Sequence, residues 1–160
     1  MIIKKGHETK NRLRLDINLS LLQVSFTVFA LFISLNPAVF QKSPLVPIQL
    51  TMSIPLLMSS IFARSKVAAT KRPAMWEQFG FISFLISYTF LLNVLGILLA
   101  AYIGSAVGLT FLIFNVLMAF LYSFFDVIEE PKKLPSRIVK DLFFLSLILF
   151  GGIFPALGVY

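Results

Sequence analysis

The chain contains no cysteine, one histidine and only seven acidic residues in 160. Without cysteine it can form no disulfide, thiolate nucleophile, zinc–thiolate site or iron–sulfur cluster. The one histidine, His7, lies in an N-terminal segment that we expect to be mobile, so no serine in the membrane has a histidine partner. No phosphate-binding glycine loop is present either. The sequence therefore predicts no catalytic residue, no cofactor and no metal site.

Charge is also missing from five long stretches of the chain. Hydrophobic residues make up 58% of the chain, against about 45–50% in soluble domains. Crossing the hydrocarbon core takes roughly 20 apolar residues in a helix. The sequence therefore predicts an all-α, polytopic membrane bundle with helices at about 18–38, 45–63, 79–101, 104–125 and 142–160. Pro55 lies inside the second stretch, which makes that span the least regular of the five.

The basic residues predict how the helices are oriented. Thirteen of the fourteen lie in residues 1–17, 64–78 or 126–141, and the remaining one is Lys42. By the positive-inside rule the N-terminus is then cytoplasmic and the C-terminus outside, in the cell (plasma) membrane. Residues 1–17 form a basic tail and residues 18–160 a single transmembrane domain. Topology explains the net charge of +7, so we expect no nucleic-acid partner.

Small and polar residues recur at helical spacing within four of the predicted helices. The stripes are Gln23, Thr27, Ala30 and Ser34; Gln49, Ser53 and Ser60; Thr89, Asn93, Gly96 and Ala100; and Gly104, Gly108, Asn115 and Ala119. Two interpretations are open.

In the first interpretation the stripes are packing faces. Small residues such as Gly96, Ala100, Gly104 and Gly108 let helices approach closely in lipid. Asn93 and Asn115 lie at similar depth, so their side-chain amides would then pair across the hairpin. In the second interpretation the polar members line a wet path for a solute: Gln23, Thr27, Gln49, Ser53, Asn93 and Asn115.

The segments between the spans offer weaker signals. Four basic residues of the 64–78 segment are placed to contact anionic lipid headgroups or simply to fix the topology: Arg64, Lys66, Lys71 and Arg72. Acids such as Asp126 and Glu129 could serve a lipid enzyme, but a solvated charged loop is the simpler reading, because metal ligands must converge.

The sequence thus predicts a non-enzymatic membrane protein that acts through helix–helix association, as a subunit or accessory of a membrane assembly. The alternative is a small homo-oligomeric channel or transporter for a neutral or weakly charged solute. Besides the lipid bilayer, the expected partner is a second copy of the chain or another membrane protein.

Overall fold

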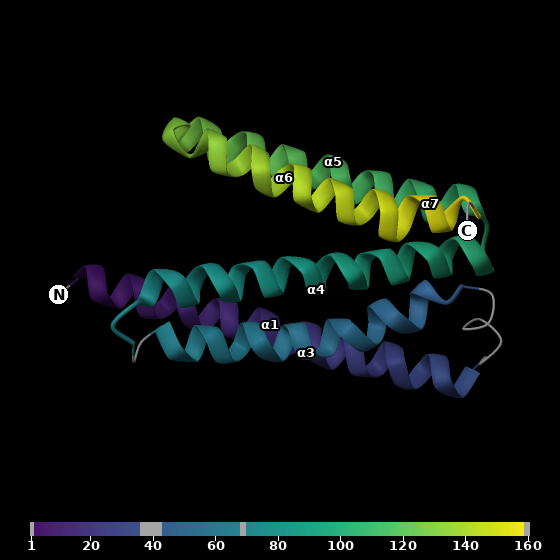
Figure 1. Ribbon diagram of the computed structural model, residues 1–160, viewed down its shortest axis with the longest axis horizontal. Helices are drawn as coiled ribbons and strands as arrows, with labels where there is room; N and C mark the ends of the chain where they lie inside the picture. The colour runs from purple at the N-terminus through teal and green to yellow at the C-terminus, as the bar shows by residue number, and fades with distance from the viewer. Residues whose placement is uncertain (1, 36–42, 68–69, 159–160) are drawn as a thin grey trace. The chain divides into compact units, whose positions relative to one another are not determined.

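The protein is almost entirely helical in the residues that the structure, a computed structural model, describes: 2–35, 43–67 and 70–158 (Figure 1). The elements are α1 (Ile2–Leu35), α3 (Leu45–Val67), α4 (Pro73–Tyr102), α5 (Ser105–Glu129), the 3-10 turn η1 (Pro131–Lys133), α6 (Leu134–Ile148), the π-helical turn η2 (Leu149–Ile153) and α7 (Phe154–Ala156). The predicted fold class, an all-α membrane bundle, is confirmed.

Four helical segments are long and apolar enough to cross a membrane: Leu45–Val67, Pro73–Tyr102, Ser105–Glu129 and Leu134–Ala156. Within α1, the apolar stretch among the described residues is the shorter Leu15–Ala30. The end of the first predicted span, residues 36–38, and the last two residues of the fifth lie outside the described residues. A chain with this many apolar helices is embedded in a membrane.

The helices extend well beyond the apolar stretches. α1 begins at Ile2, so the segment predicted as a mobile tail is helical, and α4 begins at Pro73, six residues before the predicted start. Residues 126–141, predicted as a charged loop, instead complete α5, form η1 and begin α6. Charged residues such as Lys, Arg and Glu are good helix formers. Hydropathy therefore indicates which segments are apolar but not where their helices end.

The chain divides into two compact units, each described here by itself. The first comprises Met1–Lys42 and Leu50–Tyr88, and the second comprises Ser43–Gln49 and Thr89–Tyr160. In the second unit, Gly104 caps α5 with φ 144°, a backbone conformation that favours glycine. Gly104 thereby allows the tight turn between α4 and α5.

Candidate intramembrane polar site

The last membrane-crossing segment of the second unit is interrupted near its C-terminal end. α6 passes at Leu149 into the π-helical turn η2, which contains Gly151 and Gly152, and Pro155 follows in α7. Proline has no N–H and cannot donate to the carbonyl four residues before it, here that of Gly151. The carbonyl of Gly151 therefore needs a donor from elsewhere, because lipid offers none.

Two amide side chains from other helices donate to carbonyls of this segment. Gln49 Nε2 donates to the carbonyl oxygen of Gly151 at 2.7 Å, and Asn93 Nδ2 donates to that of Leu147 at 3.1 Å. Gln49 is 4% exposed and Asn93 is fully buried. The start of α3 and the middle of α4 are thus tied to the interrupted segment by hydrogen bonds within the apolar layer.

The two glycines of η2 make room for these amides. A β-carbon on Gly151 would lie 2.5 Å from Asn93 Nδ2 and 3.4 Å from Gln49 Nε2. One on Gly152 would lie 2.5 Å from Asn93 Oδ1. Any larger residue at either position would push the Asn93 amide out of place. Gly151 and Gly152 therefore allow the Asn93 amide to pack closely against η2.

Each amide keeps one oxygen without a partner. Gln49 Oε1 and Asn93 Oδ1 are both buried and accept no hydrogen bond from the residues that the structure describes. An unsatisfied buried acceptor costs about 1–3 kcal/mol, and native structures contain few of them. These two oxygens are the most unusual chemical feature of the second unit.

Other members of the predicted polar path lie elsewhere. Asn115 is half-buried and its Nδ2 donates to Phe111 O in its own helix at 2.8 Å. The predicted amide pairing between Asn93 and Asn115 is therefore wrong, because Asn93 donates instead to the carbonyl of Leu147 in α6. Ser53 belongs to the first unit, where its Oγ donates to Leu50 O at 2.7 Å.

The predicted stripe of the first helix faces outward. Gln23, Thr27, Ala30 and Ser34 are all exposed, and Thr27 Oγ1 donates to Gln23 O at 2.9 Å. The buried side of α1 instead carries Asn18 and Ser25, at 1% and 0% exposure.

Asn18 begins a chain of hydrogen bonds in the first unit that the sequence analysis missed. Its Nδ2 donates to Ser60 Oγ at 2.9 Å, and Ser60 Oγ donates to Gly80 O at 2.7 Å. α1, α3 and α4 are linked in this way. The seven-residue spacing of Asn18 and Ser25 was the available signal, and the longer outward stripe obscured it.

The small residues of α4 and α5 pack closely within the second unit. A β-carbon on Gly108 would lie 2.6 Å from Ala100 Cβ and closer still to the carbonyl oxygen of Gly96. One on Gly96 would lie 2.5–2.7 Å from the side-chain carbons of Leu112. Gly104 differs from the expectation, because nothing lies within 4 Å of its β-carbon position. It serves the turn rather than the packing.

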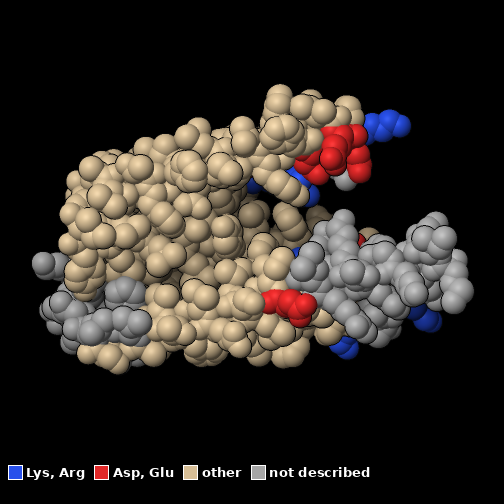
Figure 2. Space-filling model, turned by 180° about the vertical axis from the view of Figure 1, so that it is seen from behind, with Lys and Arg blue, Asp and Glu red and all other residues tan. Residues whose placement is uncertain are grey.

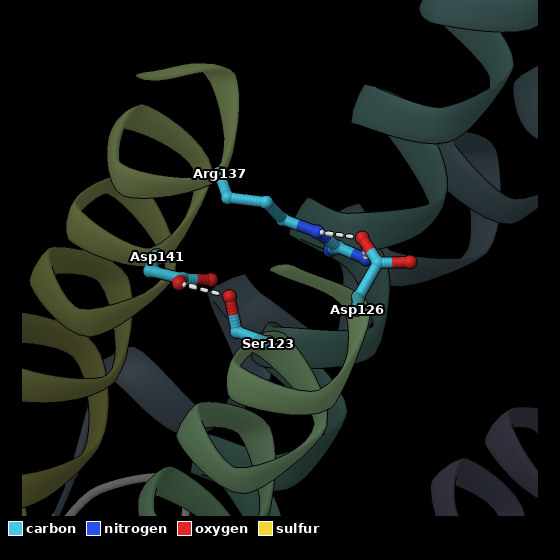
Figure 3. Close-up of polar contacts among 4 residues, drawn as sticks. All are labelled: Ser123, Asp126, Arg137 and Asp141. Carbon is cyan, nitrogen blue, oxygen red and sulfur yellow. Dashed lines mark hydrogen bonds and ion pairs between the residues drawn. The ribbon is translucent and has the colours of Figure 1, made fainter. Parts of the chain in front are cut away.

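Polar side chains also meet near the turn between α5 and α6, in the segment that was predicted to be a loop (Figure 3). Arg137 Nε and Nη2 each lie 2.5 Å from Asp126 Oδ2, and the guanidinium lies 5.2 Å from the centre of the Tyr122 ring. Ser123 Oγ donates to Asp141 Oδ2 at 2.5 Å. A mostly apolar groove of about 480 Å³ runs beside them. Each carboxylate is engaged, so the cluster ties the ends of the two helices together.

The predicted lipid-contact residues separate into two groups. Lys66, Lys71 and Arg72 are exposed. Arg64 is only 6% exposed, and its Cγ lies 3.6 Å from the β-carbon position of Gly80. It therefore packs inside the first unit instead of facing headgroups. On the face that Figure 2 shows, the charged side chains lie toward the right of the view and the rest of the described surface is uncharged.

Among the described residues no three His, Cys, Asp or Glu side chains are grouped so as to hold a metal ion. Comparison of the chain with protein-family models, curated proteins and solved structures gave no match.

Proposed function

We propose that this protein is a non-enzymatic subunit or accessory of a membrane assembly, and that the outward stripe of α1 binds a helix of its partner. The stripe consists of Gln23, Thr27, Ala30 and Ser34. We further propose that the protein lies in the cell membrane with its N-terminus in the cytoplasm, as the basic residues indicate.

The observation that carries the proposal is the exposure of Gln23 within an uncharged stretch of α1. An amide moved from water to a medium without hydrogen bonds costs about 4–8 kcal/mol. Thr27 satisfies its own hydroxyl within the helix. The Gln23 side-chain amide has no hydrogen-bond partner among the described residues, so it is the group that still needs one. A second helix provides one, and the small neighbours Ala30 and Ser34 allow its backbone to approach.

The geometry of α1 also separates this stripe from the contacts inside the first unit. At about 100° per residue, Ser25 lies roughly 200° around the helix from Gln23. The helix thus has a polar side that packs inward through Asn18 and Ser25, and a second small, polar side that faces away. A helix side that contacted only lipid would be expected to carry apolar residues, so the small, polar character of this second side is unexplained by lipid contact.

Photo-crosslinking in the native membrane tests the proposal. Because the chain has no cysteine, single Gln23→Cys, Thr27→Cys and Val24→Cys variants can each carry a benzophenone label. Val24 is the matched control, since it is 49% exposed and lies about a quarter turn from Gln23. Protein adducts from the first two positions and not from the control support the proposal, and the adduct mass separates a second copy from another protein. Lipid adducts alone at all three positions refute it.

The second candidate is a small channel or transporter for a neutral solute. It is favoured by the meeting of Gln49 and Asn93 at a span interrupted by Gly151, Gly152 and Pro155, since transporters place binding sites at such interruptions. Solute flux in proteoliposomes that is abolished by Asn93→Leu and unchanged by a control, Asn115→Leu, would support it. Flux that is equal in both variants, or absent from the unaltered protein, would count against it.

A further inference from the structure

The polar site formed by Gln49, Asn93 and η2 contains two hydrogen-bond acceptors that no described residue uses. Both amide nitrogens donate to backbone carbonyls, which fixes how the two amides are turned. The oxygens Gln49 Oε1 and Asn93 Oδ1 are consequently presented as acceptors, buried and without a donor in the described part of the chain.

We propose that these two oxygens bind a small, uncharged hydrogen-bond donor inside the apolar layer, and that water is its smallest form. This inference does not depend on the association function proposed above, because the stripe of α1 contributes nothing to the site.

The chemistry of the site selects a donor. Two carbonyl oxygens repel carboxylate or phosphate groups, and they satisfy a hydroxyl, an amide N–H or water. The neighbouring π-helical turn η2 also supports a binding site here, because single π-helical turns are frequent at functional sites. Each oxygen that gains a donor recovers the cost of being left unsatisfied in a medium that offers no other partner.

The surrounding sequence argues for an uncharged ligand. Residues 43–49, 89–125 and 142–158 of this unit contain no Asp, Glu, Lys, Arg or His. A cation held there would be buried without a counter-charge, which is far more expensive than burying a neutral polar group. A neutral donor carries no such penalty.

Close packing limits the size of the ligand. The amide nitrogens of Gln49 and Asn93 lie 3.4 and 2.5 Å from the same point, the β-carbon position of Gly151, so they are within about 6 Å of each other. Leu112 Cδ2 closes another side, 3.2 Å from the β-carbon position of Gly152. The two oxygens belong to these same amides, and buried waters regularly satisfy polar atoms of this kind.

Water-edited solid-state NMR of the full, isotope-labelled chain in liposomes tests the proposal. Polarisation is transferred from water protons, and its build-up is followed at each side-chain amide. Asn115 is the matched control, since it is the same residue type on a neighbouring helix with its amide bonded within that helix. We expect build-up at Asn93 and Gln49 severalfold faster than at Asn115.

Two results would overturn the proposal. Build-up at Asn93 and Gln49 no faster than at Asn115 would mean that the oxygens are dry and that the amides only hold the helix together. A saturable change of the Asn93 and Gln49 shifts on titration with NaCl or KCl, absent at Asn115, would assign the site to a cation instead. Both measurements use the unaltered protein, so no variant has to fold, and neither depends on a partner at α1.

Discussion

Replacing Gly108 by alanine should separate α4 from α5. The added methyl group would lie 2.6 Å from both the Cβ and the backbone N of Ala100, and closer still to the carbonyl oxygen of Gly96. Two of these three atoms belong to the backbone, so no side-chain rotation can relieve the clash. The helices must move apart or bend, and the hairpin loses contacts on both sides of the new methyl group.

The expected cost follows from known overpacking of well-packed sites, about 1–3 kcal/mol. Unfolding in mixed micelles with increasing SDS measures the change in free energy. Val107→Ile is the matched control, because it adds one carbon at the neighbouring position, where the side chain is 43% exposed. The control should differ from the unaltered protein by less than about 0.5 kcal/mol, as surface changes usually do.

A Gly108→Ala protein as stable as the Val107→Ile control would refute the reasoning, because it would mean that the two helices do not touch there. Gly96→Ala provides a second check of the same interface. Its methyl group would lie 2.5–2.7 Å from side-chain carbons of Leu112. Truncating Leu112 to alanine removes those carbons and therefore the clash. The Leu112→Ala change should therefore cost less in the Gly96→Ala background than alone, a positive coupling that only contacting residues give.

Three further changes test other parts of the fold, each by the same unfolding measurement. In a double-mutant cycle, Asn18→Leu and Ser60→Ala should couple by about 0.6 kcal/mol and at most about 1.7, the range for such bonds in membranes; strictly additive effects would show that the bond is not formed. Asp126→Asn should cost at most about 1 kcal/mol, less at high salt, because its ion pair is near the surface; a salt-independent loss would contradict this. Gln49→Leu should cost about 1–3 kcal/mol, and less when Pro155→Ala restores a backbone donor; an equal cost in both backgrounds would disprove the link.

Hydropathy was enough to predict the fold class, because lipid forces apolar stretches of about 20 residues into helices. It could not predict where the helices end. Residues 126–141 contain Pro131 and several charges, features that indicate a loop, yet Arg137 pairs with Asp126 and Ser123 donates to Asp141 across the turn at η1. That pairing depends on the tertiary arrangement, which no pattern in the local sequence records.

The candidate site was predictable in its parts and not in its arrangement. Helical spacing alone selected Gln49 and Asn93, and the same rule also selected Gln23, which is exposed on α1, and Asn115, whose amide is bonded within its own helix. Periodicity assigns residues to one face of a helix but does not say which neighbour covers that face. The partner of Asn93 was therefore assigned to the wrong helix.

A stronger signal for the site lies in the fifth span itself. Pro155 cannot donate to the carbonyl of Gly151, so a proline in a membrane helix creates a demand for a side-chain donor at a known position, four residues earlier. Within the apolar stretches, few residue types can meet that demand without charge, and the amides, with two N–H donors each, are among them. Gln49 is hydrogen-bonded to that carbonyl. Pro155 thus explains why a glutamine stands at position 49. The Gln49 amide nitrogen is used in this bond, and its oxygen Oε1 is one of the two atoms that we propose bind a ligand.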